Sequence, residues 1–475
     1  MEQSNPFLPP PGFEDSSSYL SSSFHRFETF ETFHTPLQYP PLRFQNFDNP
    51  QPFSTSAGGS FGAPQPNALS YPTLPIEGFG DGARNLFPPD SMEETQRMIA
   101  YLCHVTKFAR DVEGCEKRAG GNNNVILFSC VPLSGKYNGQ RICCILRTRR
   151  RNWFKTTPPT DEHMKNSVAA THFFREVKGL PIPSTLVWDC TYENHIQSPY
   201  LIQECAAGDT LEAVYDKLSR GLKHTKHPRN PHLERRCKIA RSVAKVMADI
   251  DKTELEGYGV FGAHVNMPNK GSNLYADFEI CRDHVHGNVG TKIPTAPVFS
   301  DWVNNILNAQ MEKCSDISLN LSPEEIGKIQ KLRQIGTQMK AQGLFEDQPA
   351  VLWHNDFYPR NIMVKNTRHN SVLTAVIDWD EAVAFPRIVT RQPPSFLWEM
   401  EDSPLLHEEM VTIRLAFKAE MEVLRPGYMD DADIYVRALI RALCIYAMFG
   451  PSYKYHHEVS FYDLSSGWDT WMESE

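Results

Sequence analysis

The sequence predicts an α+β protein with two lobes, a small lobe rich in β-strands followed by a large helical lobe, and a disordered tail in front of them. Short alternating apolar segments fill the chain up to about residue 205, whereas after Gly208 apolar residues recur at the spacing of long helices. The composition also changes sharply near Asp90. We therefore predict a tail over 1–90, a β-rich lobe over 91–205 and a helical lobe over 206–475.

The composition of the whole chain argues against several kinds of partner and site. A net charge of −9 gives no global positive field for nucleic acid or anionic lipid, so we expect neither partner. The apolar stretch near Leu439–Phe449 is interrupted by Arg441 and is too short to cross a bilayer. The 11 cysteines show no C-x-x-C spacing, so we expect reduced thiols, no zinc site and a cytoplasmic location, with the nucleus as an alternative.

Residues 1–90 have the composition of a disordered segment. They hold 15 of the 35 prolines and 12 of the 27 phenylalanines, yet no Lys, Val or Cys. A segment so poor in branched aliphatic residues buries too little surface to offset the entropy lost on folding. Four phenylalanines recur at every third position, at Phe24, Phe27, Phe30 and Phe33. This spacing indicates either a docking element for a protein partner or an unstructured apolar stretch, and the sequence leaves both open.

The elements of the β-rich lobe follow in order from Ser91. Ser-Met-Glu-Glu is a capping box, which predicts a helix from there to about Phe108. Alternation then predicts strands, and a periodic pattern that stops at Gly179 predicts a second helix. The elements expected after the first helix are strands Asn124–Val131 and Gln140–Arg147, helix Asn166–Lys178 and strand Tyr200–Cys205.

The helical lobe is predicted from long stretches with helical spacing of apolar residues. Two short β segments, Ala350–Trp353 and Val372–Ile377, interrupt these stretches. The expected helices are Leu211–Leu218, Leu233–Asp251, Trp302–Cys314, Pro323–Gln342, Leu405–Val423 and Asp431–Phe449.

The residues that suggest chemistry lie within 352–382. This stretch contains His354-x-Asp356, then Asn361 five residues after the aspartate, and Asp378 at the end of the second β segment. Phosphoryl transfer needs a carboxylate that orients the acceptor hydroxyl and takes its proton, and carboxylate and carboxamide oxygens that bind Mg²⁺. Asp356 is suited to the first task, and Asn361 with Asp378 to the second.

This H-x-D-x-x-x-x-N block followed by Val-Ile-Asp resembles the catalytic and metal-binding loops of the aminoglycoside phosphotransferase family, and most closely its large fungal branch. The resemblance implies a bilobal, protein-kinase-like fold with ATP, or GTP, between the lobes. It implies that Asp356 is the catalytic base, that His354 braces the loop and is a second catalytic candidate, and that Asn361 and Asp378 bind Mg²⁺. Acceptors in this family are small hydroxylated or amino compounds such as aminoglycosides, choline and homoserine.

Three upstream segments resemble further parts of the family, in the correct order. Residues 119–125, with Gly120 and Gly121, correspond to the glycine loop over the phosphates. Ser167–Glu176 and the Leu-Pro-Ile-Pro that comes next correspond to the family's helix and I-P-x-P turn. The strand that ends at Glu204 corresponds to the one that contacts the nucleotide base, which implies a nucleotide contact there.

The chain departs from the family pattern around the phosphates. The strand position that usually carries Lys has Arg147, a bidentate phosphate binder, although several neighbouring arginines compete for this assignment. The helix position expected to hold a Glu that orients this cation has Ser167. The third position of the metal motif is Asp380 rather than Gly, and Tyr358 stands where Ser/Thr protein kinases have Lys. These two departures argue against a protein kinase.

Two functions of different classes are compatible with these residues. Asp356, Asn361 and Asp378 favour a phosphotransferase that acts on a hydroxyl or amine of a small molecule, and Asp380 with Glu381 would suit a cationic acceptor. The missing helix Glu and the thin glycine loop favour instead an inactive module that binds a nucleotide or a partner. A metal-dependent hydrolase would need a denser cluster of His and Asp than the chain has.

Overall fold

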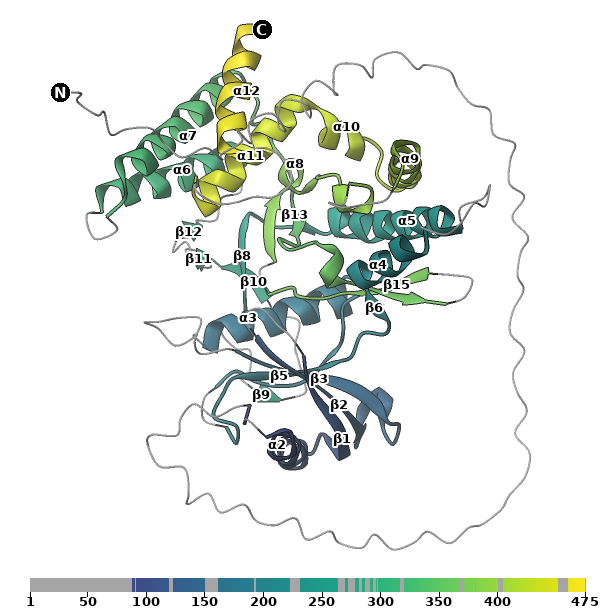
Figure 1. Ribbon diagram of the computed structural model, residues 1–475. Coiled ribbons are helices and arrows are strands. Elements are labelled where there is room, and N and C mark those ends of the chain that lie inside the picture. Colours follow the sequence, from purple (N-terminus) through teal and green to yellow (C-terminus); the bar gives the residue numbers. More distant parts are fainter. Residues whose placement is uncertain are drawn as a thin grey trace, which may run out of the picture. The chain divides into compact units, whose positions relative to one another are not determined.

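The computed structural model describes most of the chain from Pro88 onward (Figure 1). The predicted tail therefore lies outside the described residues apart from Pro88 and Pro89, and Gly120 and Gly121 lie in a gap. The described residues are 88–89, 91–118, 123–149, 161–191, 194–222, 231–263, 270–271, 278–281, 284–286, 291–293, 296, 298–316, 320–367, 371–380, 382–399, 405–451 and 460–474.

The β-rich lobe is built on a six-stranded sheet with the strand order β1-β2-β3-β5-β4-β9. All neighbouring strands in this sheet are antiparallel, and the edge strand β9 comes from much later in the chain. The strands are β1 (Ala109–Arg118), β2 (Asn123–Pro132), β3 (Ile142–Arg149), β4 (Thr185–Asp189), β5 (Tyr200–Glu204) and β9 (Lys270–Gly271).

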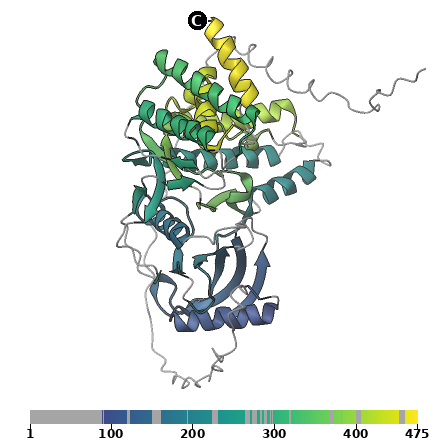
Figure 2. The same ribbon diagram turned by 90° about the vertical axis from the view of Figure 1, so that its left-hand side faces the viewer.

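Helices α2 (Met92–Val105) and α3 (Asp161–His172) cover opposite faces of this sheet. Leu102 of α2 packs in one apolar cluster with Ile202, whereas Val168 of α3 packs in another with Leu201. Because neighbouring residues of a strand point to opposite faces, the two helices must lie on opposite sides. Figure 2 shows α2 along the face turned away from the helical lobe. Helix α3 continues as a π-helical turn, Phe173–Val177. Phe174 of this turn packs with Leu352 and Val376 of the helical lobe, so α3 lies between the sheet and that lobe.

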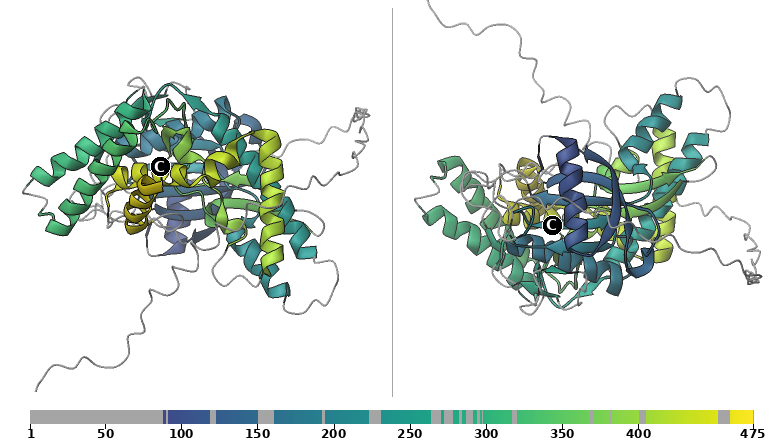
Figure 3. Two further views of the ribbon diagram at one scale, coloured as in Figure 1. Left: turned by 90° about the horizontal axis from the view of Figure 1, so that it is seen from above. Right: turned by 90° about the horizontal axis from the view of Figure 1, so that it is seen from below.

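The helical lobe has two apolar clusters on either side of a central β region. Helix α5 packs with α4 and α9 in one cluster, and α6, α7, α11 and α12 form the other. Seen from above, α6 and α7 lie on one side and α9 on the other (Figure 3). The helices are α4 (Leu211–Leu222), α5 (Pro231–Lys252), α6 (Phe299–Ser315), α7 (Pro323–Ala341), α8 (Arg387–Thr390), α9 (His407–Leu424), α10 (Tyr428–Asp433), α11 (Tyr435–Phe449) and α12 (Phe461–Ser474).

The remaining strands form three small sheets. A five-stranded sheet has the order β10-β8-β16-β13-β7, a three-stranded sheet has the order β15-β14-β6, and β11 pairs with β12. Their bounds are β6 (Asp209–Thr210), β7 (Glu254–Leu255), β8 (Gly259–Ala263), β10 (Phe278–Cys281), β11 (His284–His286), β12 (Thr291–Ile293), β13 (Ala350–Trp353), β14 (Ile362–Asn366), β15 (Ser371–Val376) and β16 (Val383–Pro386).

The connection between the lobes, residues 205–208, rests directly on the hairpin of β14 and β15. Thr374 donates its hydroxyl to the carbonyl of Ala207 at 2.5 Å. Gly208 has a φ of +105°, and a Cβ there would lie 2.3 Å from the carbonyl oxygen of Val364. Only glycine fits such a close approach with this backbone conformation.

The predicted fold class is confirmed: a β-rich lobe precedes a helical lobe, in the arrangement of a protein-kinase-like fold. The predicted helices and strands are present, although α3 begins at Asp161 rather than near Asn166 and α11 begins at Tyr435 rather than Asp431. The elements that were not predicted include strands β1, β4, β8, β10 and β16 and helix α12. No helix in the described part of the chain is long and apolar enough to span a membrane.

Candidate active site

Strand pairing brings two loops together at the centre of the helical lobe. The catalytic loop, residues 354–361, joins β13 to β14, and the metal loop, residues 377–382, joins β15 to β16. Trp353 pairs with Val383 at one end of the loops, and Ile362 pairs with Val376 at the other. The amide of Ile377 also donates to the Asn361 carbonyl at 2.9 Å, so the loops are bonded backbone to backbone.

His354 holds the two loops together from within. Its side chain is 3% exposed, and its Nε2 lies 2.9 Å from the carbonyl oxygen of Ile377. Its ring meets that of Trp379 edge to face, with 4.5 Å between the centroids. Burial lowers the pKa of His354, which favours the neutral imidazole. These contacts are those of a bracing residue.

Asp356 is oriented by two residues of its own loop. Asn361 donates its amide to Oδ2 of Asp356 at 2.7 Å and to its carbonyl oxygen at 2.9 Å. Arg360 donates to Oδ1 of the same carboxylate. Asn361 is buried, whereas the side chain of Arg360 is 56% exposed. Arg360 was not predicted from the sequence, although its position four residues after Asp356 is a spacing at which opposite charges often pair.

Asp378 occupies an unusual backbone conformation at the start of the metal loop. Its φ is +66°, in the left-handed region, which Asp tolerates better than most residues. Its pKa is raised to about 6, first because the surrounding protein desolvates it and second because Asp380 carries the same charge, while Arg147 opposes the shift. The side chain is still 47% exposed, so water limits this desolvation.

The donor atoms of Asn361 and Asp378 fit Mg²⁺. The amide nitrogen of Asn361 is bound to Asp356, so its carboxamide oxygen is the atom for a cation, and Asp378 offers a carboxylate. Among the described residues, no three His, Cys, Asp or Glu side chains gather as a complete metal cage. Mg²⁺ at phosphoryl-transfer sites is usually bound by one or two protein oxygens, with phosphates and water completing the shell, so this incomplete donor set suits it.

Arg147 reaches from β3 to the metal loop. Its guanidinium donates to Asp380 and, at 3.4 Å, to Oδ1 of Asp378. Asp380 also accepts from the hydroxyl of Ser167 at 2.6 Å and from the amide of Asn123 at 3.2 Å. Arg147 of the strand and Ser167 of the helix therefore both contact the carboxylate of Asp380 in the metal loop. The role of Asn123 was missed, although it lies in the stretch predicted to cover the phosphates.

Glu204 does not join this group. Its carboxylate lies 3.6 Å from Lys136 and 3.7 Å from Arg175, and its pKa is lowered by a hydrogen bond from Tyr137 and by Lys136, against the effect of burial. The side chain therefore ties α3 to the sheet. The predicted nucleotide contact of Glu204 is untested, and that of Gly120 and Gly121 lies outside the described residues.

A comparison with protein-family models agrees with this geometry. Residues 299–389 match the phosphotransferase enzyme family, and this range contains both loops, with Asp356, Asn361 and Asp378. The match does not resolve the fungal branch, and no curated protein sequence matched the chain.

Solved phosphotransferase structures resemble the chain only distantly. Aminoglycoside phosphotransferase APH(4)-Ia is 16% identical, with 73% of this chain and 96% of that one covered and a TM-score of 0.36. The Plasmodium vivax ethanolamine kinase Pv091845 is 12% identical, with 80% and 89% covered and a TM-score of 0.40. The GDP and kanamycin complex of APH(2")-IIia is 11% identical, with 80% and 97% covered and a TM-score of 0.34. Likenesses this distant do not identify an acceptor or a mechanism, so both must be inferred from the residues of this chain.

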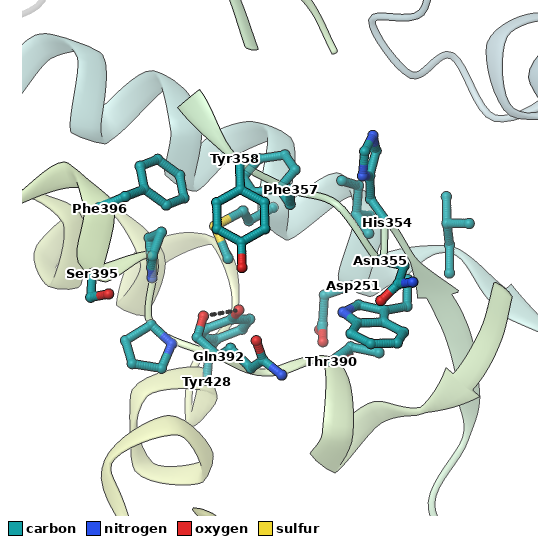
Figure 4. Close-up of a pocket in the computed structure, with 16 residues that line it drawn as sticks. Asp251, His354, Asn355, Phe357, Tyr358, Thr390, Gln392, Ser395, Phe396 and Tyr428 are labelled. Atoms are coloured by element: carbon teal, nitrogen blue, oxygen red, sulfur yellow. Dashed lines mark hydrogen bonds between the residues drawn. The ribbon is translucent and has the colours of Figure 1, made fainter. Parts of the chain in front are cut away.

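A cavity that is open to solvent lies beside the catalytic loop. Figure 4 shows the Tyr358 hydroxyl pointing into it, towards Gln392 and Tyr428. Among the described residues that line it, Asp251 carries the only ionised side chain. The other lining residues are aromatic, aliphatic or neutral and polar: Met247, Ile250, Leu352, Trp353, His354, Asn355, Phe357, Tyr358, Thr390, Gln392, Pro393, Pro394, Ser395, Phe396 and Tyr428.

Proposed function

We propose that this protein transfers the terminal phosphoryl group of a Mg-nucleotide, ATP or GTP, to a hydroxyl group of a small molecule. The observation that carries the proposal is the packing of the two loops. It sets Asp356 and Asn361 beside the loop that begins with Asp378, and Arg147 reaches that second loop from the β-rich lobe. These are the groups that phosphoryl transfer requires.

Asp356 would orient the acceptor hydroxyl and accept its proton. Asn361 fixes Oδ2, which leaves Oδ1 as the oxygen that faces the acceptor. Arg360 donates to Oδ1, and its exposed side chain would leave as the acceptor enters. Positioned acid–base groups typically contribute about 10²–10⁴-fold in rate.

Arg147 would bind the nucleotide phosphates, since a guanidinium matches phosphate oxygens in pairs. Asn361 and Asp378 would hold Mg²⁺, which when bound neutralises charge on the phosphates. Oδ1 of Asp378 lies 3.4 Å from Nη2 of Arg147. Asp378 would give up this contact when it binds the metal. Gly120 and Gly121 as phosphate contacts and a cytoplasmic location are parts of the same proposal.

The cavity beside the catalytic loop favours an uncharged acceptor. Asp251 is 2% exposed and accepts hydrogen bonds from Arg391 at 3.0 Å and from Arg425 at 2.6 Å. These two arginines neutralise its charge, so it offers little attraction to a cationic acceptor. Aromatic walls with hydroxyl and amide groups suit a neutral hydroxylated molecule with a flat apolar face. This differs from the cationic acceptor expected from the sequence, because Asp380 pairs with Arg147. Glu381 lies outside the described residues.

The test is a turnover assay with two sets of acceptors and with both ATP and GTP. One set contains neutral polyols and phenols, and the other contains amino alcohols and aminoglycosides. We expect phosphorylated product from the neutral set. Asp356→Asn should lower turnover at least about 10²-fold while Mg-nucleotide binding stays within a few-fold of wild type.

Each outcome of this assay points to a different conclusion. Faster reaction of the amino set would reject the neutral acceptor and keep the transferase. If wild type and Asp356→Asn are equally slow with every acceptor, the transferase proposal fails. Nucleotide binding without turnover would then indicate the binding module, an alternative that the pairing of Arg360 with Asp356 also fits.

A further inference from the structure

Arg147 is held by a carboxylate of the other lobe. Its side chain is 12% exposed and donates to Asp380 of the metal loop. In kinase-like sites the strand cation is usually positioned by a Glu on the helix of the small lobe. Here α3 has Ser167 at that position, and the Ser167 hydroxyl donates to the same Asp380 at 2.6 Å.

We propose that Asp380 is the positioning residue for Arg147 and replaces, from the metal loop, the carboxylate that α3 lacks. Asp380 would not touch the reacting atoms, because it acts through Arg147, which would contact the nucleotide phosphates. The role of Asp380 in catalysis therefore rests on the proposed function, whereas the contact between Asp380 and Arg147 is observed in the structure.

The surroundings of Asp380 orient it as well as neutralise it. Oδ1 accepts from Ser167, and Oδ2 accepts from Arg147 and from the amide of Asn123 at 3.2 Å. The donors come from α3, β3 and the start of β2, and the Asp380 side chain is only 16% exposed. Charge-assisted hydrogen bonds with little water nearby are strong and directional, so they fix the carboxylate.

Helix α3 is attached to the sheet by a different ion pair. Arg175, in the π-helical turn after α3, lies 3.7 Å from Glu204 of β5. Glu176 of the same turn lies 3.1 Å from Arg175 and is thereby directed to that cation. In this pair the helical turn supplies the cation and the sheet supplies the carboxylate, whereas in kinase-like sites the strand supplies a Lys and the helix supplies a Glu. Arg147 is therefore not needed to hold α3.

The metal loop would then carry both a metal ligand, Asp378, and the residue that positions Arg147, the cation proposed to bind the phosphates. Asp378 and Asp380 are two residues apart, and Arg147 contacts both. When Asp378 turns to the metal, Asp380 keeps Arg147 in place. The position of the cation would depend on the contact between the lobes rather than on the position of α3.

Exchanging the two side chains tests the proposal. The double variant Ser167→Asp with Asp380→Ser keeps one carboxylate and one hydroxyl but moves the carboxylate to the helix. By titration calorimetry with Mg-ATP and Mg-GTP, we expect Asp380→Asn to raise Kd at least about tenfold and Ser167→Ala about two- to fivefold. The exchange variant should bind within about threefold of wild type. Asp469→Asn, which removes an exposed ion pair with Lys331, is the matched control and should leave Kd unchanged.

Two results would overturn the proposal. One is a wild-type Kd for Asp380→Asn. The other is an exchange variant that melts like wild type yet binds as weakly as Asp380→Asn, because a carboxylate on the helix would then not replace Asp380. Steady-state kinetics adds a test of mechanism, since Asp380→Asn should raise KM for the nucleotide far more than KM for the acceptor. Equal increases would indicate general damage to the site and contradict a positioning role.

If wild type binds no nucleotide, the proposed function fails and the ligand-free protein decides the positioning claim. Thermal unfolding of Arg147→Met, of Asp380→Asn and of the double variant then forms a mutant cycle. We expect the two shifts in Tm to be clearly non-additive, because each variant breaks the same contact. Additive shifts would show that Asp380 does not hold Arg147.

Discussion

Asp251 lines the cavity and Asp356 belongs to the adjoining catalytic loop, and arginines hold the two carboxylates in opposite ways. Asp251 is buried, and Arg391 and Arg425, which lie 140 and 174 residues further along the chain, donate to it. Asp356 is partly exposed and pairs with Arg360, four residues away in the same loop. The first carboxylate is part of the packed interior, whereas the second can exchange its partner for a ligand.

The difference shows how burial decides what an ion pair does. Removing one partner of a buried pair leaves a charge without compensation in a region of low dielectric, which is costly. An exposed pair competes with water and with the entropy of two long side chains, so breaking it costs little. The exposed partner of Asp356 therefore suits the proposal that this aspartate accepts a substrate.

The largest effect on stability is expected at Asp251. Asp251→Asn should lower the free energy of unfolding by about 3–5 kcal/mol, because it removes the buried carboxylate that Arg391 and Arg425 share and leaves Arg391 with Asp431 alone. Denaturant unfolding monitored by fluorescence measures this change. Asp469→Asn, which breaks an exposed pair, is the control and should cost less than about 1 kcal/mol. Equal losses of unfolding free energy in the two variants would show that burial does not decide the cost of breaking an ion pair in this protein.

Asp378 should show an effect that depends on ligand rather than on folding. In wild type, Mg-nucleotide at about 100 times Kd should stabilise the protein by about 2.7 kcal/mol. Asp378→Ala should abolish the part of the thermal shift that requires Mg²⁺, because the variant lacks a metal ligand. Thermal shifts with nucleotide, with and without Mg²⁺, measure this part. A shift of wild-type size in the variant would exclude Asp378 from the metal site.

Arg360 should contribute little to folding. Arg360→Gln should change the free energy of unfolding by less than about 1 kcal/mol, because its side chain is 56% exposed. The same denaturant titration applies, with Asp251→Asn as the opposite reference. A loss above about 2 kcal/mol would mean that the Arg360–Asp356 pair is structural after all.

The smallest effect is expected from the Phe-rich tail. Deleting residues 1–86 should leave the melting temperature and turnover nearly unchanged, because a segment of this composition is expected to make few native contacts. Pro89 is kept because its carbonyl accepts from Lys117 at 2.9 Å. A large drop in melting temperature would show that the tail packs on the folded lobes.

Local sequence predicted most of the fold because most elements carry their own signals. Helix α7, for example, has a complete capping box in which Ser322 and Glu325 bond each other reciprocally. Strand β1 was missed because it is largely charged and exposed and has irregular register, so no alternation is visible. Strand β4 is only five residues long and comes closely after the I-P-x-P turn, so it lacks a separate signal.

The candidate site was predictable where its residues are close in sequence. Asp356 and Asn361 share one loop, and their spacing alone indicated their relation. The partner of Arg147 was not predictable, because 233 residues separate it from Asp380 and only the folded chain brings them together. The sequence predicted a missing helix carboxylate, but it could not show that a carboxylate of another element contacts both Arg147 and Ser167.

The close approach of Gly208 to Val364 has a mechanical consequence. The connection between the lobes touches the backbone of the β14–β15 hairpin, and that hairpin leads into both loops of the candidate site. Any rotation of the β-rich lobe would therefore turn about a point that is fixed to the catalytic machinery. The inter-lobe connection and the hairpin that leads to Asp378 would stay together during such a movement, while Arg147 of β3 would move with the β-rich lobe relative to the metal loop.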